Sequence, residues 1–213
     1  MHVLFRFGCY CECFLSSSCL FAALVANKSV NYILINYLCT DKCFPLLVQQ
    51  HFNGADAFNR SWEEFKVGFN DTAGNFWVGT ELLHQLTKNG RYKLKVDMRH
   101  RSTETAWEWA EYDTIVVSNE ASGYLMHLGG YWGSWPDALL LHSGSRFTTY
   151  DRDNDENSNQ NCAVTMGGGF WWNNGCHKRN SGLNTPLGSV GDFRWNHTSH
   201  IYRLSISRLW LTC

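Results

Sequence analysis

The stretch YDRDNDENSNQNCA, residues 150–163, joins an acidic run to an amide-rich tail and ends beside a cysteine. Alternating aspartates on an extended or turning backbone can aim their carboxylates at one point, and Ca²⁺ takes about 6–8 such oxygen ligands. An EF-hand would need Gly at the sixth position and Glu at the twelfth, where this stretch has Glu156 and Cys162. By its spacing alone, this acidic loop (residues 150–161) fits a solvated charge run as well as a calcium site.

The residues that follow favour the calcium interpretation. CAVTMGGGFWWNNGCH, residues 162–177, places Cys162 and Cys176 on either side of a glycine-rich segment with two adjacent tryptophans. A disulfide closing this segment would stabilise the fold by about 3 kcal/mol in the chain-entropy picture. It would also anchor the C-terminal end of the acidic loop.

Two short helices are predicted in the first half of the chain. In RSWEEFKVGF (60–69), Ser61 and Glu64 form a capping-box pattern and Gly68 provides a stop. In GTELLHQLTKNG (79–90), Thr80 is the expected N-cap, three leucines share one face, and Asn89-Gly90 closes the helix.

Alternating apolar residues predict strands over 91–98, 106–117, 124–131 and 201–211. In the last of these, Tyr202, Leu204 and Ile206 are expected on one face. Residues 132–200 show little periodicity but many Gly, Asn, Ser and Trp. Helices and strands followed by a loop-rich half predict an α+β domain, and loops this long usually need a ligand, metal or disulfide to hold them.

Composition and motifs exclude some functions. The chain has 213 residues, a net charge of -1 and a pI near 6.7, so no global basic excess favours a polyanion partner such as nucleic acid. It has no G-x-S-x-G elbow, no H-E-x-x-H helix and no Walker loop, which leaves a hydrolase without support. We therefore expect a protein that is not an enzyme.

Cysteines and glycosylation sequons indicate the secretory route. The later cysteines resemble a secreted disulfide pattern, and Asn-x-Ser/Thr sequons begin at Asn27, Asn59, Asn70 and Asn196. The apolar run 14–26 ends in small residues, so residues 1–26 are expected to be a signal peptide and 27–45 an extension of unclear status. The alternative is that residues 1–43 are an extension with no role in the fold.

Three ordered blocks resemble the fibrinogen C-terminal domain, the recognition module of fibrinogen chains, ficolins, tachylectins, angiopoietins and tenascins. They are FNRSWEEFKVGFNDTAGNFWVGTELLHQLT (58–87), YDRDNDENSNQNCA and GGFWWNNGCH (168–177). The resemblance implies a central antiparallel sheet with a loop-rich distal subdomain that carries Ca²⁺, a disulfide and a ligand pocket. The domain would cover 46–213, truncated at its N-terminal side, because residues 1–43 do not match the family's first strand.

The resemblance assigns the calcium ligands residue by residue. The ion would be held by the side chains of Asp153 and Asp155 and by the carbonyls of Asn157 and Asn159, and Asp151 would contribute indirectly or through water. One extra residue before Cys162 leaves the carbonyls of Ser158 and Gln160 as an alternative pair. Cys162–Cys176 would be the distal disulfide, whereas the pairing of Cys39, Cys43 and Cys213 is left open, with Cys213 free or intermolecular.

The family's pocket is built around a cis peptide bond, here Cys176-His177, with backbone N–H groups turned toward an acetyl or acidic group. Asn173 and His200 stand where acetyl-binding members have aromatic wall residues, and a third such position falls near Ser189. Trp171 and Trp172 are expected in the core. A wall with fewer aromatics should grip an acetyl methyl less well.

The expected function is that of a secreted, calcium-dependent recognition module for acetylated or acidic glycans, of the lectin and innate-immune type. The alternative is a protein ligand for a cell-surface receptor or an extracellular-matrix interaction domain, as in angiopoietin-like and tenascin-like members. Neither function involves nucleic acid or a membrane span, and an oligomer is compatible with both.

Overall fold

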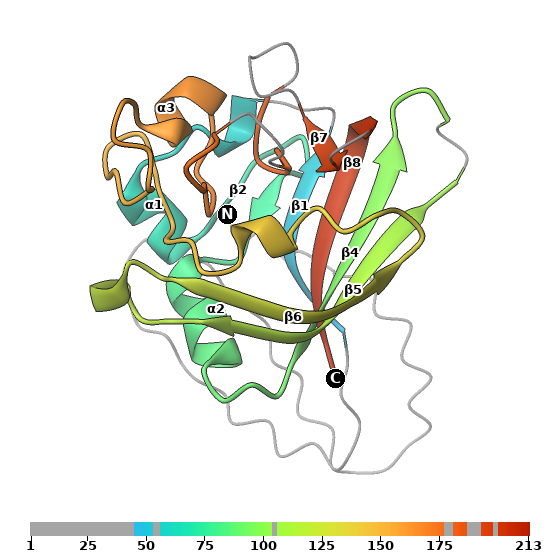
Figure 1. The fold of residues 1–213 in the computed structure, drawn as a ribbon, viewed down its shortest axis with the longest axis horizontal. Helices are drawn as coiled ribbons and strands as arrows, with labels where there is room; N and C mark the ends of the chain where they lie inside the picture. The colour runs from blue at the N-terminus through green and yellow to red at the C-terminus, as the bar shows by residue number, and fades with distance from the viewer. Residues whose placement is uncertain (1–44, 53–55, 104–105, 177–180, 187–192, 198–199) are drawn as a thin grey trace, which may run out of the picture. The chain divides into compact units, whose positions relative to one another are not determined.

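The computed structural model describes residues 45–213 except 53–55, 104–105, 177–180, 187–192 and 198–199. Its strands are β1 (Leu46–Phe52), β2 (Phe69–Asn70), β3 (Phe76–Trp77), β4 (Lys93–His100), β5 (Glu108–Val117), β6 (Met126–Gly133), β7 (Arg194–His197) and β8 (His200–Thr212). They form one antiparallel sheet in the order β2-β3-β1-β8-β4-β5-β6, with β7 paired to β8 (Figure 1). The α+β class and the central antiparallel sheet are confirmed.

The strand patterns read from the sequence correspond to β4, β5, β6 and β8. Leu94, Val96 and Met98 of β4 are buried, as their alternation predicted. In β8, however, Leu204 is buried while Ile206 is only partly so, and burial resumes at Ser207 and alternates from there. The reason is a register shift in the pairing with β4, between Arg99 and His100. Beyond this irregularity the odd-numbered residues of β8, from Ser207 onward, face the core in place of the even-numbered ones. The expectation that Ile206 shares a face with Leu204 is therefore wrong.

Helix α1 (Trp62–Val67) has the predicted termini. The hydroxyl of Ser61 accepts from the N–H of Glu64, the carboxylate of Glu64 accepts from the N–H of Ser61, and Gly68 follows the last turn. Helix α2 (Thr80–Thr87) begins one residue earlier than expected, with Gly79 at the N-cap. Thr80 is not the cap because its buried hydroxyl donates to the carbonyl of Phe65, which ties α2 to α1.

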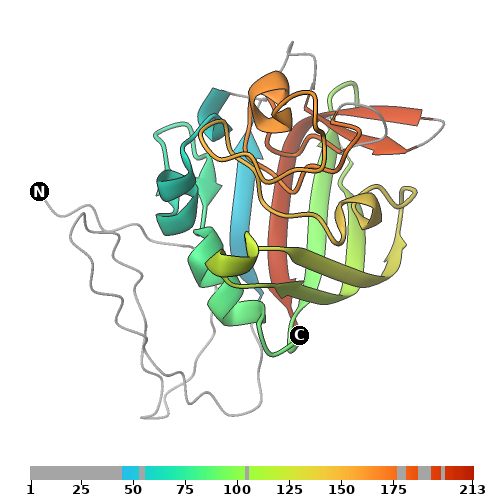
Figure 2. The ribbon, with the colours of Figure 1, turned by 60° about the vertical axis from the view of Figure 1, so that its left-hand side comes forward.

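The second half of the chain contains more regular structure than its sequence indicated. It holds helix α3 (Cys162–Met166), begun by the side chain of Asn161, and the short turn η3 (Leu140–His142). Two further turns, η1 (Asp56–Phe58) and η2 (Glu120–Ser122), lie earlier in the chain. Figure 2 shows α3 and its neighbouring loops, in orange, at the end of the long strands away from the C-terminus.

An aromatic cluster fills the space between these loops and the sheet. Trp171 contacts Trp77, Phe147 and Phe170, with ring centroids 6.1, 4.9 and 5.5 Å apart, and its indole N–H donates to the carbonyl of Tyr124 over 2.7 Å. Trp171 and Trp172 are 1% and 0% exposed, which confirms them as core residues. No helix among the described residues is long and apolar enough to cross a bilayer.

Candidate metal and recognition site

Asp155 is the centre of the acidic loop. One carboxylate oxygen, Oδ1, accepts from the N–H of Asn157 and the other, Oδ2, from the N–H of Cys162, both over 2.8 Å. Burial raises the pKa of this carboxyl, and the neighbouring charge of Asp153 raises it further, while the two N–H donors lower it. The loop therefore holds a half-buried carboxylate whose charge is not fully compensated by the protein.

The surroundings of Asp153 fit a cation. Its Oδ1 accepts from the N–H of Asp155 over 3.3 Å, and its carboxylate lies close enough to that of Asp155 to raise the pKa of Asp155. Within the described residues, neither forms an ion pair with Lys, Arg or His. Two adjacent carboxylates without a cation repel each other, and a calcium ion would remove that repulsion.

The remaining proposed ligands are backbone carbonyls. Among the described residues, no donor reaches the carbonyls of Asn157 or Asn159, or those of Ser158 and Gln160, so either pair is available to an ion. No group of three or more His, Cys, Asp or Glu gathers in the described part of the chain. The residues present thus fit a site of two carboxylates completed by carbonyls and water, and which carbonyls bind stays a prediction.

Asp151 connects the acidic loop to helix α1. Its Oδ1 accepts from the N–H of Trp62, the first residue of α1, over 2.9 Å, and from the hydroxyl of Thr149 over 2.7 Å. Negative charge is favourable at a helix N-terminus, where backbone N–H groups lack partners. Asp151 therefore ties the start of the acidic loop to α1.

The disulfide Cys162–Cys176 is present, with the two Cα atoms 5.1 Å apart. The amide of Asn157 reaches across to the carbonyl of Asn174 over 3.0 Å and to the sulfur of Cys176 over 3.3 Å. The acidic loop and the disulfide segment are thereby joined. Cys213 is also disulfide-bonded, so of the two alternatives left open for it, the free thiol is wrong.

Only part of the expected ligand pocket falls on described residues. Asn173 lies in the disulfide segment, but its amide donates to the carbonyl of Leu141 and its oxygen accepts from the N–H of Gly175, each over 2.9 Å. His200 starts β8 and stacks on Tyr202 with centroids 6.1 Å apart. His177 and Ser189 lie outside the described residues, and with them the predicted cis bond. The structure thus joins Cys176 and Asn173, while no described contact links His200 to them.

The predicted glycosylation sites differ in exposure. Asn59 and Asn70 are exposed, and Asn59 borders a shallow hollow with Tyr150 and Val164. Asn196 is only 6% exposed and lies within β7, a poor position for an attached glycan. Asn27 lies outside the described residues, and all these sites stay predictions.

A buried histidine that sequence reasoning missed supports the disulfide segment. His142 donates from Nδ1 to the carbonyl of Trp171 over 2.8 Å and accepts at Nε2 from the N–H of Ser181 over 3.1 Å. Burial lowers its pKa from 6.5 to about 4, so the ring is neutral at pH 7. Nothing in the local sequence LLHS signals this, because both partners lie far along the chain.

Comparison with known proteins identifies the class. The family described as fibrinogen beta and gamma chains, C-terminal globular domain, matches residues 16–204. The chain therefore belongs to this family. The match begins before residue 46 and overlaps the predicted signal peptide 1–26, so the boundaries at 26 and 45 stay predictions.

Individual relatives refine this assignment. Tenascin of Gallus gallus is 36% identical over 74% of this chain and 8% of its own length, and human tenascin-R is 38% identical over 67% and 10%. Human microfibril-associated glycoprotein 4 is 38% identical over 62% of this chain and 52% of its own length. The fibrinogen-like globe domain of human ANGPTL2 superposes with a TM-score of 0.68 at 31% identity, covering 78% of this chain and 79% of that domain. The chain thus spans a small part of the tenascins and about half of the microfibril-associated protein.

Proposed function

We propose that this chain is an extracellular, calcium-dependent module that binds a protein of the extracellular matrix or a cell-surface receptor, and that it is not an enzyme. The observation that carries the proposal is the set of relatives: tenascins, a microfibril-associated glycoprotein and the globe of ANGPTL2. These support the matrix or receptor alternative better than the acetyl-glycan function. Domains of one fold bind many different partners, so the residues of the binding site, and not the fold, determine which partner is bound.

The residues around Cys176 also favour the matrix or receptor function over acetyl-glycan binding. An acetyl pocket needs aromatic walls around its methyl group. The amide of Asn173, at one wall position, is engaged within its own loop, and Trp171 and Trp172 are 1% and 0% exposed. The described residues therefore offer little apolar wall beside Cys176, and the acetyl-glycan function stays a prediction.

The proposed calcium ion would be held by Asp153 and Asp155 with the carbonyls of Asn157 and Asn159, or of Ser158 and Gln160. It would supply the positive charge that two adjacent carboxylates lack. Asp155 also accepts from the N–H of Cys162, where the disulfide segment begins. Ordering Asp155 would thereby order the segment that presents the recognition surface.

The direct test is binding of the purified domain to cultured cells and to deposited matrix, in calcium and in chelator. We expect saturable binding that needs calcium, is lost after protease treatment of the surface, and is unaffected by N-acetylated sugar. The variant Asp153→Asn/Asp155→Asn should lose it. Asp56→Asn, an exposed aspartate outside the loop, is the matched control and should bind normally.

Two outcomes would contradict the proposal. Binding that survives protease but is displaced by N-acetylated sugar would establish the lectin function instead. Calcium should also raise the melting temperature, since saturation at 100 times Kd adds about 2.7 kcal/mol. Equal melting curves in calcium and chelator would count against the metal site.

A further inference from the structure

A hollow of ≈ 450 Å³ lies beside the start of the acidic loop and is lined by Asn59, Tyr150 and Val164. Asn59 lies between η1 and α1, Tyr150 begins the acidic loop, and Val164 belongs to α3. Tyr150 and Val164 are large hydrophobic side chains that the fold leaves 47% and 60% exposed. The hollow therefore combines apolar contact area with the asparagine of a glycosylation sequon, Asn59-Arg60-Ser61.

Hydrogen bonds fix the three segments that form the hollow. The N–H of Gly169, which follows α3, donates to the carbonyl of Phe58 over 3.2 Å, directly before the sequon. The side-chain amide of Asn161, at the N-cap of α3, donates to the carbonyl of Thr149 over 2.9 Å, directly before the acidic loop. The walls of the hollow are thus formed in advance, so a ligand that packs there does not have to order them.

The position of Asn59 suits an attached sugar. On its C-terminal side, Nε of Arg60 donates to the carbonyl of Ala57 over 3.1 Å, and Ser61 caps α1. The backbone around Asn59 is therefore held in place. Within the described residues, the side-chain amide of Asn59 itself takes part in no hydrogen bond. A sugar attached to this amide would therefore displace no hydrogen bond of the described fold.

We propose that the hollow is the docking site of the chain's own glycan, attached to Asn59, and that the first N-acetylglucosamine packs its C–H face on Tyr150 and Val164. Packing there removes apolar surface of the sugar and of both side chains from water. The tyrosine ring provides a large, flat contact area. The inference rests on the proposed extracellular function, because such glycans are attached in the secretory route.

Attachment joins the sugar to the chain covalently. The side-chain amide nitrogen of Asn59 forms a bond to C1 of N-acetylglucosamine and gives up one proton. The bond from C1 to a phosphate oxygen of the donor, a lipid pyrophosphate oligosaccharide, breaks, and the lipid pyrophosphate leaves. Once attached, the sugar is present at the hollow at a high effective concentration, so a contact too weak to capture a free sugar still forms.

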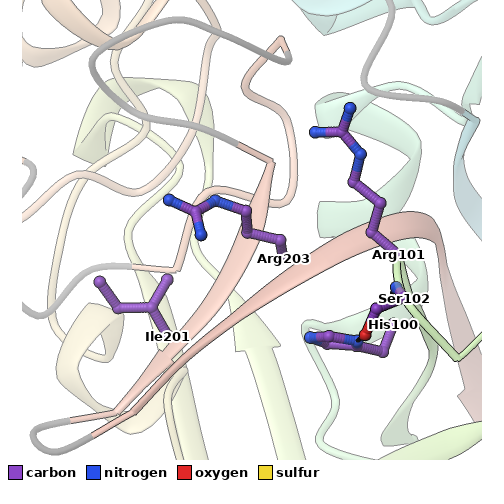
Figure 3. Close-up of a pocket in the computed structure, with 5 residues that line it drawn as sticks. All are labelled: His100, Arg101, Ser102, Ile201 and Arg203. Atoms are coloured by element: carbon purple, nitrogen blue, oxygen red, sulfur yellow. Dashed lines mark hydrogen bonds between the residues drawn. The ribbon is translucent and has the colours of Figure 1, made fainter.

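A second hollow, of ≈ 400 Å³, shows what distinguishes the hollow beside Asn59. Figure 3 shows two arginine side chains of its lining extending from neighbouring chain segments. Its described lining residues are His100, Arg101, Ser102, Ile201 and Arg203. None of them belongs to a sequon, and Asn196, which pairs with Ile201 across β7 and β8, is only 6% exposed. An attached sugar is therefore favoured at the hollow beside Asn59.

A docked sugar would connect elements that carry the proposed calcium site. Tyr150 directly precedes Asp151, which accepts from the N–H of Trp62 at the start of α1. Val164 lies in α3, whose first residue, Cys162, donates from its N–H to the acidic loop. Contact with both side chains adds a link between α1, the acidic loop and α3. We therefore expect the glycan to stabilise this region without contacting the proposed calcium ligands.

The test uses the chain secreted by cultured animal cells, with each glycan trimmed by an endoglycosidase to one N-acetylglucosamine. Peptide mass spectrometry should find this sugar on Asn59. Asn59→Gln should lower the melting temperature by about 2–4 °C, a shift that corresponds to losing one modest contact in a domain of this size. Tyr150→Ala should lower it by a similar amount. The two changes together should add little to either one, since both remove the same contact.

Asn70→Gln is the matched control, because Asn70 is also an exposed sequon asparagine but does not line the hollow. It should leave the melting temperature unchanged. If Asn59→Gln fails to fold, an amidase can release the untrimmed glycan from the folded chain, which produces the change Asn59→Asp. This release should lower the melting temperature when Tyr150 is present and should have no effect in Tyr150→Ala.

Three results would overturn the proposal. They are a secreted chain without sugar on Asn59, equal losses from Asn59→Gln and Asn70→Gln, and fully additive losses from Asn59→Gln and Tyr150→Ala. Failure of the proposed function gives a different result. A chain that shows the expected glycan and the expected shifts, but binds no protein of the matrix or of the cell surface, would contradict the proposed function and leave this inference in place.

Discussion

The sheet scaffold (β1, β4, β5, β6 and β8) and the loop region (described residues of 134–193) are stabilised in different ways. In the sheet, main-chain hydrogen bonds run along each strand pair, and side chains alternate between core and outer face. In the loop region, the contacts are mainly side chain to backbone, as at Asn157, Asn173 and His142. The disulfide Cys162–Cys176 and the aromatic cluster around Trp171 further stabilise the loop region.

This difference explains where a recognition site can form. A sheet uses most of its backbone groups within itself, so it offers few to a ligand. A loop fixed by side chains leaves carbonyls that no donor among the described residues reaches, as at Asn157 and Asn159. The loop region can therefore hold a cation and a partner, at the cost of depending on a few single contacts.

The largest effect is expected from Trp171→Ala in the loop region. Removing a fully buried tryptophan leaves a cavity among Trp77, Phe147 and Phe170, and should cost about 3–5 kcal/mol of unfolding free energy. The matched control on the sheet is Trp132→Ala, at a position 58% exposed, which should cost well under 1 kcal/mol. Urea denaturation measures both, and similar losses would contradict the cluster's role.

The next effect concerns the disulfide. Replacing both cysteines, Cys162→Ser/Cys176→Ser, removes a cross-link with a sequence separation of 14 and should cost about 3 kcal/mol. Amides of the acidic loop should then exchange faster, because the backbone at position 162, whose N–H donates to Asp155, is no longer cross-linked to position 176. Unchanged exchange in this loop would show that the disulfide does not support it.

The sequence predicted the sheet scaffold better than the loop region for a physical reason. Alternation in β4 follows from the two faces of a strand, and the cap of α1 depends on residues three apart, so both are local. Strand β1 was not predicted because its partners β8 and β3 lie elsewhere in the chain. His142 was missed for the same reason, since its partners Trp171 and Ser181 lie far along the chain. The disulfide was expected only through resemblance to a family.

Acidification should weaken the loop region through His142. Its folded-state pKa is lowered to about 4 from 6.5 by burial, so the unfolded chain binds the proton more tightly. The contribution of neutral His142 to the free energy of unfolding is fully present above about pH 6.5 and is lost as the pH falls toward 4. By pH 5 the loss should be about 2 kcal/mol. His142→Gln should be less stable at pH 7 but show a flatter profile; an unchanged slope would contradict the assignment.

The smallest effect is expected at the start of α1. Ser61→Ala removes the cap on the N–H of Glu64 and should cost about 1 kcal/mol. Because Asp151 also accepts from the first turn of α1, Ser61→Ala combined with Asp151→Ala should cost more than the sum of the two single changes. Strict additivity, measured by thermal unfolding, would show that the acidic loop and α1 are not coupled.

Hydrogen exchange with and without calcium tests the central claim most directly. If a cation bound by Asp153 and Asp155 orders the recognition loops on a scaffold that is already folded, calcium should slow exchange at residues 151–176. The amides of β4, β5 and β8 should be unchanged, and Asp153→Asn/Asp155→Asn should abolish the difference. Slowing spread evenly over the sheet, or no slowing at all, would contradict the account.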